Sequence, residues 1–250
     1  MSTNNKFDPG LAGVLAAETT LSHVDGLKGE LIIAGFPLDR LAANATFEEA
    51  TYLLWHGRLP TQTELDDLKQ ELAELRPLPL ATLNLLREAA QVRTTPMDAL
   101  RMAAATLDLG SGETDNLTTA NTIVARVASI VASYHRLRRG EEPIAPDPTL
   151  SHAANYLYML TGTPPSDARV RGLETYLNTI IDHSLNASTF AARVIVATQT
   201  DLVSAITGAI GALKGPLHGG APGPALETVF EIGTADRAEA VLQAKLDAGE

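Results

Sequence analysis

A histidine within a run of glycine and proline is the residue best suited to chemistry in this sequence. The run extends from Gly215 to Pro224 with four glycines and three prolines, a composition typical of a hinge or of a loop whose backbone approaches a ligand. Because Gly219 and Gly220 have no side chains, a substrate could reach the His218 imidazole and nearby amides together. A neutral imidazole donating an N–H could stabilise an enolate oxygen. The alternatives are a surface histidine and one that caps the preceding helix.

A second candidate is His183, which follows Asp182 at the end of a predicted helix. A histidine there interacts favourably with the helix C-terminus, so a structural role is the simpler interpretation. The functional alternative is a hydrogen-bond donor to a carboxylate or carbonyl of a small substrate. Asn186 and Ser188 could contact the same substrate, or they could cap the next helix.

The other histidines give weaker indications. His56 and His135 lie at predicted helix ends, where an imidazole complements the helix dipole. The arginines that follow His135 allow a phosphate-binding patch as the alternative. The six histidines contain no pair four residues apart, and no phosphate-binding loop, dinucleotide-binding glycine motif, nucleophile elbow or zinc-protease motif occurs. A metal site is therefore not expected.

Composition excludes several classes of function. The chain has 250 residues and no cysteine, which rules out disulfides and thiolate-ligated metals. Its 30 acidic and 19 basic residues give a net charge of −11, which argues against nucleic-acid binding. No segment approaches the roughly 18 apolar residues of a membrane span. With no apolar leader at its start, the chain is expected in the cytoplasm.

Periodicity and capping signals predict a mainly α protein. A single short strand is expected over residues 28–35, and the absence of alternating strands and helices argues against a parallel α/β fold. Gly208 and Gly211 within a predicted helix indicate close packing, either in the core or at a subunit interface. The expected helices cover residues 46–56, 63–75, 81–91, 95–109, 116–139, 151–161, 166–183, 188–213 with a break near Asp201, 225–232 and 235–247.

These same residues resemble the citrate synthase family. The similar segments follow one another in the family's order and span nearly the whole chain. The Asp182–Arg193 segment resembles the family's substrate-histidine segment, and Ala209–Ala221 resembles its active-site loop. The remaining similar segments are Gly10–Val14, Ala17–Thr19, Asp25–Gly26, Gly29–Ile32, Ala45–Glu49, Tyr52–Gly57 and Leu59–Pro60.

The resemblance implies an acyltransferase that joins acetyl-CoA to oxaloacetate, giving citrate and free CoA. By position, His218 would hydrogen-bond the thioester carbonyl and stabilise its enol, with Gly219 and Gly220 in the same loop. His183 would bind oxaloacetate, and Asn186 would contact the substrate. No cofactor is implied, because the CoA thioester is a substrate, and a homodimer is expected.

The resemblance also implies what this chain lacks. The family's reaction needs an aspartate base, a second histidine in a Gly-His-Arg segment and several arginines, all expected after residue 250. The 250-residue chain is therefore expected to be inactive by itself. Residues 1–219 would form a large helical domain without its closing helices, and residues 220–250 would begin a small helical domain.

Two departures from the family pattern leave alternatives open. The chain has Ile180–Ser184 where many members carry His-x-Asp-His-Glu, and it has Pro222 where many carry asparagine. A 2-methylcitrate synthase that uses propionyl-CoA fits as well, since one methylene is worth only ~1–3 kcal/mol of discrimination. A non-catalytic helical dimerisation module is the other alternative.

Overall fold

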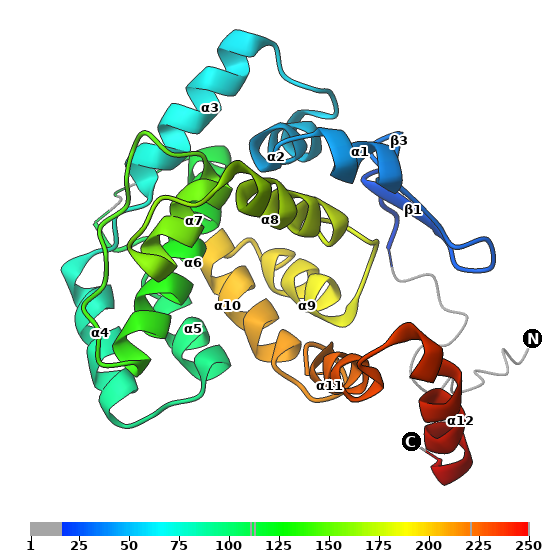
Figure 1. Cartoon of the computed structure of the whole chain (residues 1–250). Coiled ribbons are helices and arrows are strands. Elements are labelled where there is room, and N and C mark those ends of the chain that lie inside the picture. The colour runs from blue at the N-terminus through cyan, green and yellow to red at the C-terminus, as the bar shows by residue number, and fades with distance from the viewer. Residues whose placement is uncertain (1–16, 111, 113, 221, 250) are drawn as a thin grey trace, which may run out of the picture.

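A computed structural model describes residues 17–110, 112, 114–220 and 222–249. Of the similar segments, Gly10–Val14 and Ala221 lie outside these residues. In the described part, twelve α-helices accompany one small sheet near the N-terminus, as Figure 1 shows. The prediction of a mainly α fold with a short N-terminal β element is confirmed.

The sheet is a meander of three short antiparallel strands. β1 (Ser22–Asp25), β2 (Glu30–Ile33) and β3 (Phe36–Pro37) pair in that order. Ala34 and Gly35 both have a positive φ, 44° and 88°, which forms the tight turn between β2 and β3. The predicted single strand over residues 28–35 therefore coincides with the middle strand and misses its two neighbours.

Two of the first four helices, α2 and α3, begin at side chains that cap them. α1 (Leu38–Asn44) was not predicted, whereas α2 (Phe47–His56) has the expected bounds. Thr46 and Glu49 form a capping box, in which Glu49 N donates to Thr46 Oγ1 and Thr46 N donates to the Glu49 carboxylate. Thr61 does the same for α3 (Gln62–Leu75), and α4 is Leu80–Gln91.

Two of the next four helices end earlier than expected. α5 (Pro96–Ala104) stops short of residue 109, and α8 (Asp167–Thr179) stops short of His183. α6 (Asn116–Arg138) and α7 (His152–Thr161) match their predicted ranges within one residue. The early end of α8 leaves residues 180–186 outside any helix, and His183 lies among them.

The C-terminal helices follow the expected break. α9 (Ala187–Val196) and α10 (Leu202–Leu213) are separate helices because Asp201 caps α10 by accepting a hydrogen bond from Ser204 N. α11 (Pro222–Ile232), a 3₁₀ turn (Ala235–Arg237) and α12 (Ala238–Ala248) complete the described chain. Among the described residues no helix has the length and apolarity needed to traverse a bilayer.

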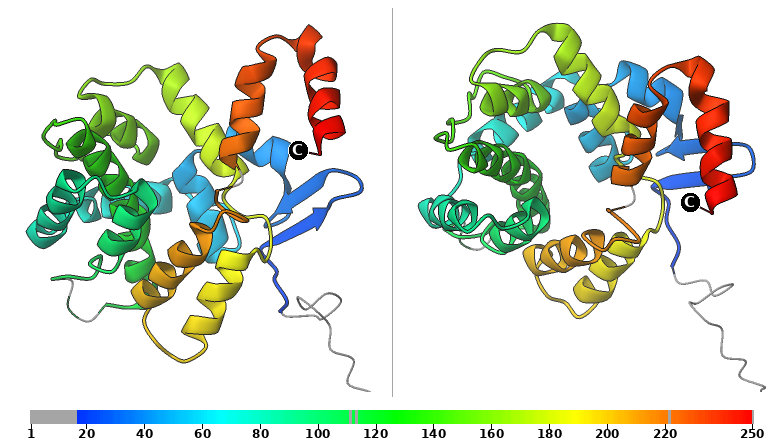
Figure 2. Two further views of the ribbon diagram at one scale, coloured as in Figure 1. Left: turned by 90° about the horizontal axis from the view of Figure 1, so that it is seen from below. Right: turned by 60° about the horizontal axis from the view of Figure 1, so that its bottom comes forward.

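The main core surrounds α6. Ile130 of α6 packs with Leu86 of α4, Ala103 of α5, and Val203 and Ile210 of α10, all of them buried. Small alanines on α5 let the neighbouring helices approach closely. Figure 2 shows α10 against α5 and α6, with α9 on its outer side. α10 therefore has firm contacts with the core, whereas α9 has no buried residue.

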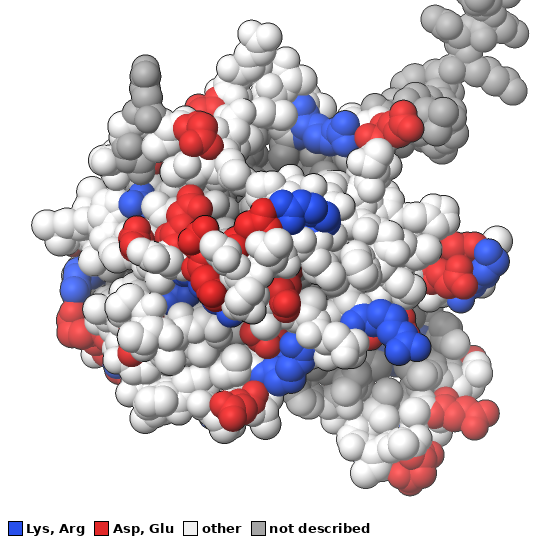
Figure 3. Space-filling view, turned by 90° about the horizontal axis from the view of Figure 1, so that it is seen from above, with Lys and Arg blue, Asp and Glu red and all other residues white. Residues whose placement is uncertain are grey.

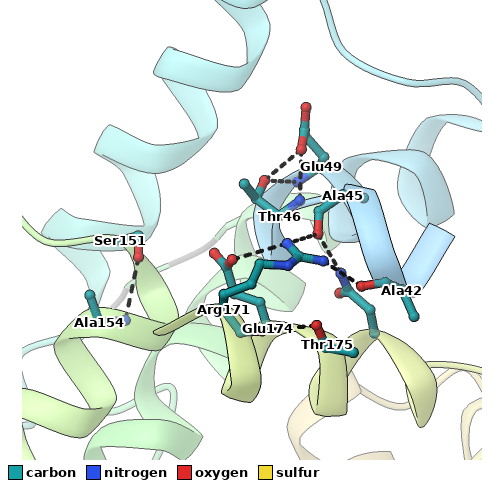
Figure 4. Close-up of polar contacts among 10 residues, drawn as sticks. Ala42, Ala45, Thr46, Glu49, Ser151, Ala154, Arg171, Glu174 and Thr175 are labelled. Carbon is teal, nitrogen blue, oxygen red and sulfur yellow. Dashed lines mark hydrogen bonds and ion pairs between the residues drawn. The ribbon is translucent and has the colours of Figure 1, made fainter. Parts of the chain in front are cut away.

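A set of polar contacts joins α8 to the end of α1, as Figure 4 shows. Arg171 donates to the carbonyl oxygens of Ala45, at 2.8 Å, and of Ala42. Asn178, which is fully buried, donates to the Ala45 carbonyl as well, at 2.8 Å. These carbonyls are the ones that a helix leaves without partners at its C-terminus, so α8 caps α1.

A second buried polar contact holds α7. His152 N donates to Glu48 Oε1 at 2.7 Å, so a carboxylate on α2 satisfies the first amide of α7. The His152 ring stacks on Phe47 with 4.7 Å between ring centroids. Burial, with the charge of Arg76 as a smaller cause, lowers the pKa of His152 to about 4. The ring is thus held neutral in the folded protein.

His152 should make the folded protein sensitive to mild acid. Its pKa is near 6.5 when unfolded and about 4 when folded, so the unfolded state binds more protons between these values. The contribution of His152 to the unfolding free energy is therefore fully present above pH 6.5 and is lost as the pH drops towards 4. Between pH 7 and 5 the loss in unfolding free energy should be about 2 kcal/mol. Urea denaturation at both pH values measures it.

The control is His152→Phe, which keeps an aromatic ring against Phe47 but cannot titrate. Between pH 7 and 5 its unfolding free energy should fall by about 2 kcal/mol less than that of the parent. Equal pH dependence in the two proteins would contradict the assignment.

Candidate active site

The candidate residues lie at one end of the hairpin formed by α9 and α10. The two helices pack along their length, and a Cβ atom at Gly208 would lie 2.2 Å from Ile195 Cδ1. Gly208 therefore lies in close contact with α9, as its place in a helix predicted, and the atom that it meets is the end of a side chain. A Cβ at Gly211 would meet Arg101 Cδ at an ordinary 3.9 Å, so packing within this chain does not require that glycine, and its place at a subunit interface stays a prediction.

The loop that carries His218 folds back onto the end of α10. Gly219 N donates to the Leu213 carbonyl at 2.8 Å, and His218 N donates to the Gly215 carbonyl at 3.0 Å. A Cβ at Gly219 would lie 2.3 Å from the Leu213 oxygen, and one at Gly220 would lie 3.0 Å from Pro216 Cα. Both glycines are thus needed by the turn itself, a reason that sequence reasoning did not supply.

A line of hydrogen bonds connects the two candidate histidines. His218 Nε2 lies 2.9 Å from Ser188 Oγ, and Ser188 Oγ donates to Asn186 Oδ1 at 2.7 Å. Asn186 Nδ2 lies 3.4 Å from His183 Nδ1. The structure thus brings His183, Asn186, Ser188 and His218 together from the start of α9 and the loop after α10.

The network assigns the ring protons of both histidines. Asn186 Oδ1 accepts from Thr189 N at 2.9 Å, which fixes the amide orientation and makes Asn186 the N-cap of α9. Ser188 must then donate to this oxygen, so the His218 Nε2 carries the proton that Ser188 accepts. The Asn186 amide donates to His183 Nδ1, which leaves the His183 proton on Nε2.

His183 differs from its simpler interpretation. Because α8 ends at Thr179, His183 is not at a helix C-terminus, and the helix-dipole interpretation is wrong. The residue lies in a turn where Ser184 N donates to Asp182 Oδ1 at 3.1 Å and Ser184 has a φ of 75°. The His183 side chain is exposed, so its ring can meet a solute.

His218 is neither a simple surface residue nor a helix cap. It is half-buried, and its ring bonds Ser188 rather than the end of α10. His56 ends α2 as expected, and its ring centroid lies 4.0 Å from that of Tyr52. At the basic end of α6, Arg136 and Arg139 both pair with Glu141, at 3.0 Å each. This carboxylate reduces the positive charge on which a phosphate patch depends.

Charge is unevenly distributed over the rest of the surface. On the face shown in Figure 3, acidic side chains gather near the centre and basic ones are scattered singly or in small groups. In the described ranges, no group of three or more His, Asp or Glu side chains is arranged to hold a metal ion. The histidines at positions 183 and 218 are therefore best considered as hydrogen-bonding groups.

Replacing Asn186 should separate its two roles. Asn186→Ala removes the N-cap of α9, which should lower the unfolding free energy by about 1 kcal/mol. Asn186→Asp keeps an oxygen for Thr189 N and Ser188 but cannot donate to His183, so its stability should stay near that of the parent. Urea denaturation at pH 7 measures both. An equal loss in the two variants would show that the cap is not the source of the stability.

Comparison with known proteins places this geometry in context. The family model described as "Citrate synthase, C-terminal domain" matches residues 10–250. The chain is 42% identical over 236 residues to the citrate synthase of Haloferax volcanii, covering 91% of this chain and 62% of the relative. It is 41% identical over 241 residues to the 2-methylcitrate synthase of Mycobacterium tuberculosis, covering 95% and 61%.

A solved structure shares the fold. The ternary complex of carboxymethyl coenzyme A and oxaloacetate with the citrate synthase of Thermoplasma acidophilum superposes with a TM-score of 0.85. The sequences are 28% identical, over 96% of this chain and 65% of that one. The chain thus spans slightly less than two thirds of the length of each of these relatives.

Proposed function

The chain belongs to the citrate synthase family, and on that premise we propose that it takes part in condensing acetyl-CoA with oxaloacetate to give citrate and free CoA. The observation that carries the proposal is the hydrogen-bonded line from His218 through Ser188 and Asn186 to His183. It holds two imidazoles a short distance apart on one end of a helical hairpin. A reaction between two small bound molecules needs such a fixed arrangement.

His183 is proposed to bind oxaloacetate. Its exposed ring has Nδ1 occupied by Asn186, so Nε2 presents an N–H to a solute. A carboxylate or ketone oxygen accepts such a bond. Asn186 acts here by orienting the ring, and its own contact with the substrate is part of the same proposal.

His218 is proposed to stabilise the enol of the acyl thioester. While Ser188 donates to Asn186 and accepts from Nε2, a neutral His218 ring has no proton on Nδ1. To donate from Nδ1, the ring gives its Nε2 proton to water and takes one up on Nδ1, and the Ser188 hydroxyl leaves Asn186 and donates to Nε2 instead. An N–H directed at the thioester oxygen would stabilise negative charge as it develops there.

The rest of the reaction is proposed to need groups beyond these residues. The family resemblance calls for an aspartate base and a Gly-His-Arg segment, and no Gly-His-Arg occurs in the 250 residues. We therefore expect the chain to hold oxaloacetate without completing the condensation by itself.

Residues 220–250 are proposed to begin a second domain. α12 packs on α11 and on the 3₁₀ turn, and this pair lies to one side of the other helices in Figure 1. Residues 1–219 would then form the large domain. Its closing helices would cover the apolar groove of about 460 Å³ that α6, α7 and α8 form.

The experiment for the catalytic proposal is oxaloacetate-dependent release of CoA from acetyl-CoA. The 250-residue chain should give no release. A chimaera that joins residues 1–250 to the remaining third of the Haloferax volcanii relative should restore it. In that chimaera His218→Ala should lower the rate about 10²–10³-fold, the usual effect of removing one donor to a developing oxyanion.

His23→Ala, on the exposed face of β1, is the matched control and should leave the rate unchanged. Full release with His218→Ala would contradict the role of His218, and release by the 250-residue chain would contradict the need for further groups. A chimaera that folds and binds oxaloacetate without releasing CoA would favour a non-catalytic helical module.

A second candidate function is 2-methylcitrate synthesis, favoured by the 41% identity to the Mycobacterium tuberculosis enzyme. The same assay with propionyl-CoA distinguishes the two reactions. A kcat/KM for propionyl-CoA more than about tenfold above that for acetyl-CoA would assign the second function, since a methylene is worth ~1–3 kcal/mol.

A homodimer is proposed as well. Val229 and Phe230 of α11 and Leu246 of α12 are 61%, 74% and 69% exposed, and exposed large apolar side chains are typical of an interface. Sedimentation equilibrium should therefore give twice the 26.4 kDa mass of one chain. Phe230→Asp should shift the protein towards monomer because it places a charge in the interface.

Val92→Asp is the control, since Val92 is 75% exposed at the end of α4. This variant should sediment like the parent. A monomer for the parent protein, or equal effects of the two substitutions, would contradict the proposed interface.

A further inference from the structure

The α9–α10 hairpin has few polar contacts with the rest of the protein. Apolar packing of Val203 and Ile210 holds α10 to α5 and α6. In the described part of the chain, the hydrogen bonds from the hairpin and its loop to other elements come from Lys214, which donates to Asp98, and from Arg193, which donates to the Glu18 carbonyl. Only the first lies at the end that carries His218.

On α5, Lys214 contacts a carboxylate that other side chains hold in place. Lys214 Nζ lies 2.5 Å from Asp98 Oδ1, and Thr95 Oγ1 donates to Asp98 Oδ2 at 2.7 Å. Arg101 Nη2 lies 3.8 Å from the same Oδ1. Hydrogen bonding to Lys214, and then to Thr95, lowers the pKa of Asp98, so the carboxylate stays ionised at neutral pH.

Asp98 is itself fixed in place. It lies in the first turn of α5, where a carboxylate is stabilised by the helix dipole, and Thr95 caps the same turn. The neighbouring residues Ala99 and Ala103 of α5 are buried in the core. Lys214 is therefore attached to a rigid part of the molecule.

Lys214 is also next to the turn that carries the imidazole. It follows Leu213, the last residue of α10, and precedes Gly215, whose carbonyl accepts from His218 N and Gly220 N at 3.0 and 3.3 Å. A shift in the end of α10 would move this carbonyl, the turn and the ring together. The 2.9 Å contact between His218 and Ser188 depends on where that end lies.

We propose that Lys214, held by Asp98, is a positioning residue for His218. The ion pair fixes the end of α10 against α5, so that the loop directs the imidazole to Ser188. Lys214 touches neither ring, and it acts through the backbone of the turn. The inference deepens the proposed function and rests on it for its catalytic meaning, whereas the geometry can be tested without catalysis.

A partly exposed ion pair normally contributes little to global stability, because water screens it and ordering two long side chains has an entropic cost. Both side chains here are partly exposed, at 41% for Lys214 and 25% for Asp98. Loss of the pair should thus leave the protein folded while releasing the loop. A residue with only a structural role would instead lower stability and leave the ring in place.

The test is nitrogen NMR of the 250-residue chain labelled with ¹⁵N-histidine. In the parent, the His218 Nε2–H bonded to Ser188 should give a ring N–H signal that exchanges slowly with water. Lys214→Met keeps the alkyl chain and removes the charge, so exchange should become at least tenfold faster while the thermal midpoint changes little. Lys214→Arg should restore slow exchange.

Two further variants complete the comparison. Asp98→Asn should give the same fast exchange, and adding it to Lys214→Met should cause no further change, because both remove one interaction. Lys69→Met on α3 makes the same chemical change away from the hairpin and should behave like the parent.

Slow exchange in Lys214→Met would overturn the proposal, and so would a fall in the thermal midpoint that accounts for the faster exchange. The function is tested separately by CoA release in the chimaera. If Lys214→Met frees the ring but His218→Ala leaves CoA release intact, the positioning role stands and the catalytic role fails. If CoA release depends on His218 but Lys214→Met leaves the ring in place, the catalytic role of His218 stands and the positioning role of Lys214 fails.

Discussion

The hydrogen bond between His218 and Ser188 connects the start of α9 to the loop after α10. The bond is possible because the two helices lie against each other along their length. Everything proposed about the two imidazoles depends on this pairing of helices, since α9 has no buried residue and the loop after α10 is bonded to the end of that helix.

The hairpin is held to the rest of the fold chiefly through α10. α10 is the member that enters the core, and the carboxylate of Asp98 meets it at its exposed end. Elsewhere, polar side chains from other elements bond the main-chain groups at the ends of helices. Arg171 and Asn178 do so for α1, and Glu48 does so for α7. These bonds run between elements, so removing one of the side chains leaves a buried main-chain group without water or protein to bond.

Sequence reasoning succeeded where the determinants are local. The capping box at Thr46 and the break near Asp201 placed helix boundaries correctly, and collinear motifs gave the family, which the family match confirms. It failed where a distant residue decides the outcome. α1 has seven residues and is capped from α8, so its own pattern is too short to read. Nothing near residues 98 or 214 signals that they meet, because 116 positions separate them. The roles of the site residues remain predictions.

The close approach of Gly208 to Ile195 connects the two helices of the hairpin. Ile195 is the penultimate residue of α9, at the end opposite to Asn186 and Ser188. A methyl group added at position 208 would first displace the end of the Ile195 side chain, which can change its rotamer. A larger side chain would have to separate the two helices, and that separation would lengthen the contact between His218 and Ser188 at the other tip. The space left at position 208 thus bears on a pair of groups that this glycine never approaches.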